Sequence, residues 1–537
     1  MNGLKSLLLL PLVVSIFSLT SCTQAGETES SVTSPVQTSG TSGSFEDQHL
    51  DDVEPLSFTG SAATLHFDPS SQGNYLVVVS SVTQTSENAT FQFSKGSPSA
   101  LALEDDSSDS ASTDEEEEDP ATSFHQYLGE IGERLRESGV PVPAPSQAAL
   151  TTSPEVGSSG SFQVLSAMNS ITTCKEVNAV LRVATGNLLI YVDKSAQENI
   201  SDSNLQTLVQ NFEKIALPRE RALFGAESDI NADGKISILM SPVVNQMTAT
   251  GGLVTGFFFP GDLYQRSSVN PCSNAQEIFY TLVPDSSGKF GTSVSANFAV
   301  DNILPGVLAH EYQHMVSFNN HVFKNRGKTE EPWLNECLSH LSEDLTGFGK
   351  ENPSRVKLFL SQTSKAPLIP AASPNLAERG ACYLFLRYLY EQSADQNLFI
   401  QRLLNTPLTG VANLEAAFQG KDPSFDQYPE FVGRWSVALS LSGTNVTSDP
   451  RYLYRERSID ADTGNFDGIC LRCDTQDGRG TILDGPTVTT VSSYPSMTSV
   501  RGTATQVYRL EKPTGSVSLS AGTGSEWTGA LVRLGRN

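Results

Sequence analysis

The 537-residue chain is poor in basic residues and, beyond its first twenty positions, has no long apolar run. Its 35 Lys and Arg are outnumbered by 60 Asp and Glu, and residues 23–120 contain a single Lys or Arg, Lys95. A formal net charge of -25 argues against nucleic acid and anionic lipid as partners. Ten carboxylates between Glu104 and Asp119 carry much of this charge. We expect a solvated spacer there, with loose calcium or partner binding as the alternative.

The one pronounced apolar stretch, residues 7–17, follows Lys5 at the N-terminus. It is too short for a transmembrane helix, so residues 1–21 are predicted to be a secretory signal peptide. Leu19-Thr20-Ser21-Cys22 resembles the lipobox of bacterial lipoproteins, which implies lipidation of Cys22 and a membrane anchor outside the cytoplasm. Because Thr23 is not the Asp that retains enteric lipoproteins in the inner membrane, we expect the outer membrane or surface of a bacterial cell envelope. The alternative is an ordinary cleaved signal followed by a chance cysteine.

Composition divides the remaining chain into segments of different character. Ser, Thr, Gly and acidic residues dominate residues 22–54 and much of 96–161, whereas alternating apolar residues indicate strands within 55–95 and 446–537. A helix at about 123–138 interrupts the second polar segment. The predicted segments are a flexible tether (22–54), a small β-module (55–95), an acidic and Ser/Pro-rich linker (96–161), a main domain (162–445) and a C-terminal β-rich domain (446–537).

Six cysteines follow Cys22, and an even number in an exported chain permits three disulfides of undetermined connectivity. Cys470 and Cys473 have no second Cys/His pair nearby, so we expect a local disulfide or two loop thiols rather than a zinc site. Cys337 and Cys382 lie in apolar helical patterns, which favours buried thiols.

Asp229, Asn231 and Asp233 precede Gly234 at the spacing of the first half of a calcium-binding loop. The twelfth position is Met240 instead of the required glutamate, which excludes a complete EF-hand. Two interpretations stay open: a partial calcium site completed by distant oxygens, or an Asx-type turn leading into a strand over residues 236–240.

The strongest chemical pattern is His310-Glu311-Tyr312-Gln313-His314. Histidines four residues apart on a helix lie on one face and can bind one metal ion, while the intervening glutamate can act as general base on a water molecule. Glu336, at the start of a second predicted helix, provides a third ligand and leaves a fourth position open for water. The alternative metzincin pattern needs Gly and His where this chain has Ser317 and Asn320, so it is excluded.

These residues, together with segments 256–262 and 381–389, resemble the hyicolysin family of zinc metallopeptidases, which are gluzincins. The resemblance covers roughly residues 175–445. It implies an α+β, thermolysin-like metallopeptidase domain with small β-rich flanking domains. It also implies zinc bound by His310, His314 and Glu336, and Glu311 as the catalytic base.

Two departures accompany the resemblance. Cys337 replaces the usual Gly, and His340 stands where thermolysin-like enzymes place the Asp that orients the first histidine. The simplest role for His340 is to support a zinc ligand; the alternatives are donation to a carboxylate and competition as a ligand. Tyr383 or Tyr388 is a candidate oxyanion donor. Residues 277–283 are the expected edge strand for a peptide substrate.

The sequence therefore predicts an exported, lipid-anchored zinc endopeptidase that acts on proteins or peptides near the cell surface. The alternative is a non-catalytic surface binding protein or adhesin that retains the fold. A purely structural zinc site fits poorly, since no fourth protein ligand is spaced to close the centre.

Overall fold

The computed structural model describes residues 44–46, 53–69, 72–85, 87–96, 120–143, 154–247, 254–371, 374–420, 422–455, 457–473, 475, 480–522 and 525–534. The expected signal peptide, Cys22 and the acidic run before Pro120 lie outside these ranges. Within them, no helix is both long and apolar enough to cross a membrane.

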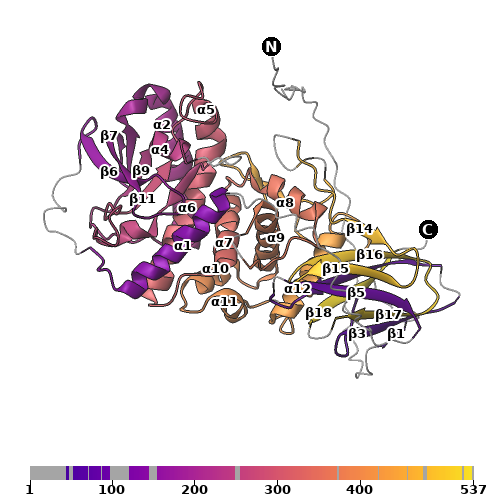
Figure 1. Cartoon of the computed structure of the whole chain (residues 1–537). Coiled ribbons are helices and arrows are strands. Elements are labelled where there is room, and N and C mark those ends of the chain that lie inside the picture. The colour runs from indigo at the N-terminus through magenta and orange to yellow at the C-terminus, as the bar shows by residue number, and fades with distance from the viewer. Residues whose placement is uncertain are drawn as a thin grey trace, which may run out of the picture. The chain divides into compact units, whose positions relative to one another are not determined.

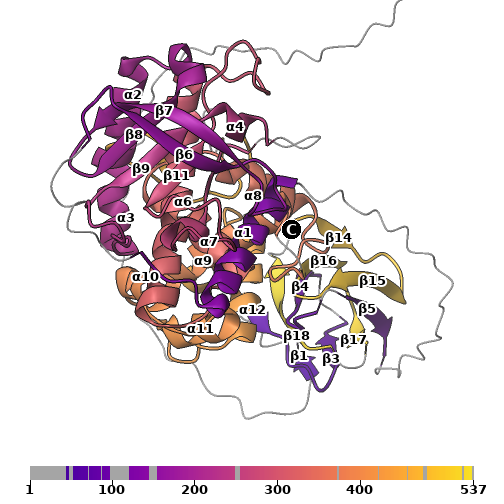
Figure 2. The same cartoon turned by 60° about the vertical axis from the view of Figure 1, so that its left-hand side comes forward.

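A six-stranded mixed sheet begins the main domain (Figure 2). Its spatial order is β10-β11-β9-β8-β7-β6, with parallel pairing of β8 to β9 and of β9 to β11 and antiparallel pairing elsewhere. The central strands β8, β9 and β11 are almost wholly apolar and buried, as expected for strands covered on both faces. The strand bounds are Ser159–Leu165 (β6), Cys174–Ala184 (β7), Leu188–Asp193 (β8), Ile236–Met240 (β9), Gly256–Phe258 (β10) and Ile278–Thr281 (β11).

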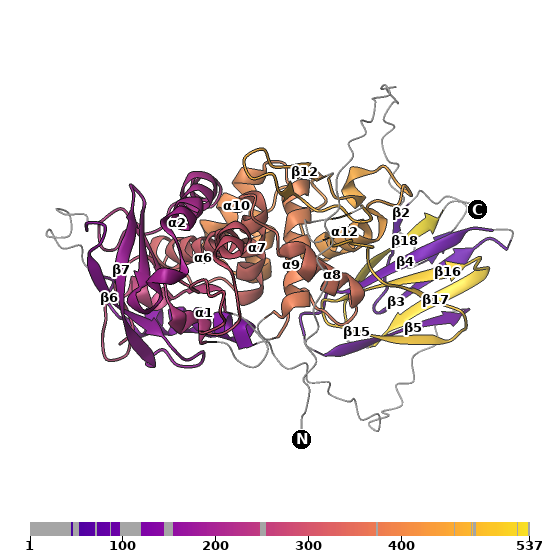
Figure 3. The same ribbon diagram turned by 90° about the horizontal axis from the view of Figure 1, so that it is seen from above.

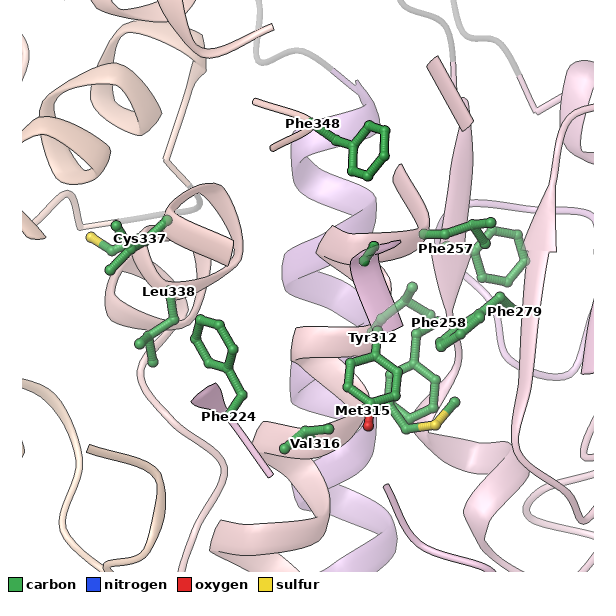
Figure 4. Packing of buried hydrophobic residues seen from close by; sticks show 14 of the residues in the cluster. Phe224, Phe257, Phe258, Phe279, Tyr312, Met315, Val316, Cys337, Leu338 and Phe348 are labelled. Carbon is green, nitrogen blue, oxygen red and sulfur yellow. The ribbon is translucent and has the colours of Figure 1, made fainter. Parts of the chain in front are cut away.

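Helices form the rest of the main domain, and α6 packs against β10 and β11 while α7 packs against α6 and α9. Figure 4 shows Tyr312 and Met315 of α6 beside Phe258 of the sheet. Helices of the N-terminal half are α2 (Asp202–Val209), α3 (Leu217–Leu223), α4 (Pro242–Asn245), α5 (Ala296–Phe298) and α6 (Leu304–Phe318). The later helices are α7 (Pro332–Leu345), α8 (Asn352–Ser361), α9 (Leu376–Gln392), α10 (Gln396–Leu404), α11 (Gly410–Ala417) and α12 (Tyr428–Leu441). The combination of sheets and helical layers is compatible with the predicted α+β class.

Strands from the two ends of the chain form a β-sandwich (Figures 1 and 3). One sheet has the order β1-β3-β17-β5-β15 and the other β14-β16-β4-β18-β2, and a shared apolar cluster lies between them. The N-terminal strands are β1 (Ser44–Glu46), β2 (Val53–Pro55), β3 (Ala62–Phe67), β4 (Asn74–Ser81) and β5 (Asn88–Lys95). The C-terminal strands are β14 (Val488–Thr490), β15 (Ser496–Arg501), β16 (Thr505–Glu511), β17 (Gly515–Ala521) and β18 (Trp527–Leu534). A short hairpin of β12 (Ser458–Ile459) and β13 (Phe466–Asp467) precedes them.

This pairing corrects the expected domain organisation. The segments 55–95 and 446–537 were predicted as separate modules, yet β4 is hydrogen-bonded to β16 on one side and β18 on the other. Neither segment supplies both neighbours of its central strands, so each needs the other to complete its sheets.

The helix expected within the 96–161 linker exists as α1 (Pro120–Ser138). It is part of the main core and does not act as a spacer: Phe124, Leu128, Ile131 and Leu135 are buried there on one amphipathic face. The main-domain sheet also begins at Ser159, a few residues before the predicted boundary.

Four of the six described cysteines form two disulfides, Cys174–Cys272 and Cys470–Cys473. Cys337 and Cys382 are buried free thiols, as their apolar helical surroundings predict.

Candidate metal centre

The three predicted ligands meet where α6 crosses the first turn of α7. His310 and His314 are one helical turn apart, and their ring centroids are separated by 4.7 Å. Glu336 places one carboxylate oxygen 3.5 Å from Nε2 of His310 and the other 3.5 Å from Nε2 of His314. Pro305 and Pro332 each occupy the first turn of their helix, where the missing amide proton costs nothing. The arrangement suits a single metal ion between two imidazoles and a carboxylate.

Arg379 of α9 keeps the ligand Glu336 negatively charged. Its Nη1 lies 3.2 Å from Oε2 of Glu336. Burial would raise the pKa of Glu336, but the Arg379 guanidinium and the two histidines hold it well below its usual range. The centre is thus built for a carboxylate that stays ionised in a buried site.

Glu343, which the sequence analysis missed, orients the first histidine. Its Oε1 lies 2.8 Å from Nδ1 of His310 and 2.9 Å from Nδ1 of His340. A proton donated from Nδ1 of His310 to this carboxylate leaves Nε2 free to bind metal. Glu343 therefore takes the orienting role for which the sequence offers no Asp at position 340, and His340 contacts the same carboxylate. Glu343 lies two turns beyond Glu336 on the same face of α7, and this spacing is the feature that could have revealed it.

Glu311 points toward the sheet. Its Oε2 accepts a hydrogen bond of 2.9 Å from the backbone amide of Phe258 in β10. Burial raises the pKa of Glu311 despite the neighbouring His310 and His314. A carboxylate with a raised pKa accepts a proton more readily, which suits a general base.

His125 of α1 is a fourth residue at the centre. One ring nitrogen of His125 lies in a group of four candidate ligand atoms that are all within 4.8 Å of one another. The other three are a ring nitrogen of His310, a ring nitrogen of His314 and a carboxylate oxygen of Glu336. Burial lowers the pKa of His125 well below its usual value, so the imidazole is neutral and can donate a lone pair. His125 is thus a candidate fourth ligand, although no fourth ligand is spaced in the sequence to close the centre. No spacing rule could have found His125, because it is brought to the centre by tertiary packing from far upstream.

The predicted oxyanion donors lie elsewhere. The Tyr383 hydroxyl donates to Oδ2 of Asp344 at 2.7 Å, and Arg387 donates to the same oxygen at 2.8 Å. The Tyr388 hydroxyl donates to the carbonyl of Arg451. Neither tyrosine lines the cavity of about 430 Å³ that adjoins His314 and Glu336. Both hydroxyls take part in the packing of α9 against neighbouring segments, and oxyanion stabilisation by Tyr383 stays a prediction.

The expected substrate strand is also corrected. β11, within the predicted segment 277–283, is hydrogen-bonded to β10 on one side and β9 on the other. The strand at the sheet edge beside α6 is β10, Gly256–Phe258. A peptide added as an extra strand would pair with β10.

The proposed calcium loop forms side-chain turns. Oδ1 of Asp229 accepts from the Gly234 amide, and Asn231 and Asp233 accept from the amides two residues ahead. The Asn231 amide group also donates to Asp233 at 3.0 Å. These bonds describe Asx turns that lead into β9. Calcium binding by Asp229, Asn231 and Asp233 stays a prediction.

The comparisons with known proteins agree with the geometry. No protein-family model matches the chain. The neutral metalloprotease ShpI of Staphylococcus hyicus is 30% identical to it over 251 residues, which cover 45% of this chain and 55% of that protein. The chain thus spans about half the length of the curated relative that it matches. The similarity to ShpI, together with the cluster of His and Glu side chains, supports a metal-dependent protease.

Proposed function

We propose that the protein is a zinc endopeptidase of the gluzincin type, with a thermolysin-like catalytic domain. The observation that carries the proposal is the convergence of His310, His314 and Glu336 next to the buried carboxylate of Glu311. Two histidines and one glutamate are a ligand set typical of catalytic zinc. Oε2 of Glu336 is buried and, apart from its ion pair with Arg379, has no hydrogen-bond partner. A bound cation would add the missing partner, so the residues present fit zinc.

Zinc held by these residues would supply a Lewis acid that polarises a peptide carbonyl and activates a water molecule. Glu311 accepts the proton of that water and passes it to the departing amine. The Phe258 amide fixes the carboxylate of Glu311 on the side of the sheet edge, where a peptide paired with β10 would lie. Glu343 holds the ring of His310, and Arg379 keeps Glu336 ionised. Protein or peptide substrates follow from this chemistry.

The test is hydrolysis of casein by zinc-loaded residues 23–537. Because α1 carries His125, a candidate fourth ligand, hydrolysis is measured both on the intact protein and after α1 has been cut free. We expect cleavage that 1,10-phenanthroline abolishes and that Glu311→Gln lowers by about 10²–10⁴-fold, the usual contribution of a general base. Zinc content should be unchanged in Glu311→Gln. The matched control is Glu198→Gln, which removes an exposed carboxylate outside the centre and should keep full activity. Full activity of zinc-loaded Glu311→Gln would overturn the mechanism.

A second candidate function is a surface binding protein that retains the metal without cleaving peptides. The specific observation in its favour is His125, because four protein ligands are typical of a structural zinc site. This function predicts stoichiometric zinc and no cleavage of any protein, even after α1 is displaced.

The cellular location rests on the N-terminal sequence. We propose lipidation of Cys22 and attachment to the bacterial cell envelope, at the outer membrane or the cell surface. The lipobox-like Leu19-Thr20-Ser21-Cys22 supports this proposal.

A further inference from the structure

The centre brings together four candidate ligand atoms, as many as a tetrahedral zinc site holds. A catalytic zinc site has three protein ligands and a fourth position for water or substrate. Here the ring of His125 lies 6.0 Å from that of His310 and 6.2 Å from that of His314, measured between centroids, with its ligand nitrogen inside the same 4.8 Å group. His125 therefore stands where a water molecule would have to bind.

Side-chain packing holds α1 in this position. The ring of Phe124, next to His125, packs edge-on against the ring of Phe257 in β10, with 5.1 Å between the ring centroids. Gly132 lies so close to Phe318 of α6 that a Cβ there would come within 2.6 Å of the ring. Beyond the helix, the carbonyl of Pro141 accepts from the amide of Gln265. The placement of His125 thus follows from contacts along the whole helix.

α1 also covers the place where a substrate would lie. His125, Leu128 and Glu133 of α1 line the 430 Å³ cavity together with His314, Asn335 and Glu336 of α6 and α7. Phe124 contacts the edge strand β10, with which a peptide would pair. One helix therefore lies beside both the metal position and a side chain of the edge strand.

We propose that α1 is a built-in inhibitory segment whose His125 acts as an exchangeable fourth metal ligand. The proposal rests on the proposed peptidase function. Activation would require that α1 leave, together with its buried apolar face, so that His125 would no longer occupy the fourth ligand position.

The fold allows α1 to be cut out without loss of the chain upstream of it. Strand β4 is paired with β16 and β18, and β5 with β15 and β17. After cleavage on both sides of α1, residues 53–96 remain bound to the C-terminal strands by these hydrogen bonds. The catalytic part would stay joined to the N-terminal segment non-covalently.

The ligand role of His125 is tested by cobalt substitution of the full chain in His125→Ala. We expect a changed visible absorption spectrum and a metal affinity lower by about tenfold or more, since one of four donors is lost. The control is Glu137→Ala, on the same helix, whose side chain is 63% exposed. It should leave both readouts unchanged. An unaltered spectrum and affinity in His125→Ala would overturn the ligand assignment.

The inhibitory role is tested on a chain whose own His125 is intact. Recognition sites for a specific protease are inserted within 97–119 and within 144–153, and the folded, zinc-loaded protein is cut at both. We expect release of the α1 peptide and a gain in casein hydrolysis of about tenfold or more, because the fourth position opens. Adding back a synthetic peptide of residues 120–143 should restore inhibition, whereas the same peptide with His125→Ala should inhibit more weakly. Equal activity before and after release, or equal inhibition by the two peptides, would overturn the proposal.

The two sets of readouts separate failure of this proposal from failure of the peptidase function. A spectral change in His125→Ala with no hydrolysis in any form would keep the ligand and reject the peptidase. Chelator-sensitive hydrolysis by the intact chain at the rate of the cut chain would keep the peptidase and reject the inhibitory segment.

Discussion

The metal centre and the β-sandwich are encoded in different ways. Helical spacing places His310 and His314 on one face of α6, and packing of the nearby helix α7 on α6 adds Glu336 from 22 positions further along the chain. The sandwich instead joins residues such as Ser80 and Thr505, whose side chains are hydrogen-bonded at 2.8 Å across 425 positions of sequence. Short sequence motifs therefore predict the metal centre, whereas the β-sandwich depends on pairing between distant strands, which the hydrophobic pattern of a single segment does not indicate.

The largest expected effect comes from placing a charged residue in β4, because this strand contributes to two apolar clusters, one inside the sandwich and one between the sandwich and α12. Val77 lies in the cluster between the two sheets, while Val78 lies in the cluster that joins the sandwich to Val437 and Leu441 of α12. Val77→Asp and Val78→Asp each bury an unpaired carboxylate, and each should destabilise the protein by about 4 kcal/mol or more. We expect Val77→Asp to lower the melting temperature of the sandwich alone and Val78→Asp to lower that of the helical part too.

Scanning calorimetry with zinc binding measured at low temperature distinguishes these variants. Because they place the same residue at adjacent positions, each serves as the control for the other. Identical calorimetric profiles would show that the sandwich and the helical part unfold as one unit, which would remove the distinction between them.

A smaller effect separates two adjacent carboxylates of α7. Glu343 contacts His310, whereas Asp344 accepts from Tyr383 and Arg387 on α9. Glu343→Gln weakens the support of a metal ligand and should lower zinc affinity by about 10–100-fold. Asp344→Asn should reduce thermal stability and leave zinc affinity nearly unchanged. Competition with a chromophoric chelator measures the affinity, and a larger loss in Asp344→Asn than in Glu343→Gln would contradict the assigned roles.

The sequence predicted those parts of the centre that depend on local geometry. The spacing of His310 and His314 follows from one helical turn, and β9 runs from Ile236 to Met240 as its apolar pattern predicts. His125 escaped prediction because only the burial of Phe124 and its neighbours against the main core brings it to the metal. The sandwich escaped it because each terminal segment alone looks like a small module, and only its missing strand partners show otherwise.

The smallest expected effect concerns Glu220 of α3, a carboxyl behind the centre with no role in binding metal. Its Oε1 accepts from Ser342 of α7, and its Oε2 is buried without a hydrogen-bond partner. Burial raises the pKa of Glu220 to about 8, so the folded protein holds a proton that the unfolded chain releases above about 4.5. The stability contributed by this proton is complete below about pH 4.5 and is lost as the pH rises through 8, by at most about 1.4 kcal/mol per pH unit. Glu220→Gln mimics the protonated acid and cannot titrate, so its melting temperature should gain on that of the wild type between pH 7 and 8, by the equivalent of at most about 1.4 kcal/mol, and level off above pH 8. A constant difference in melting temperature between Glu220→Gln and the wild type across that range would mean that Glu220 is already ionised in the folded protein. The helices around the metal would then tolerate a second buried negative charge beside Glu343.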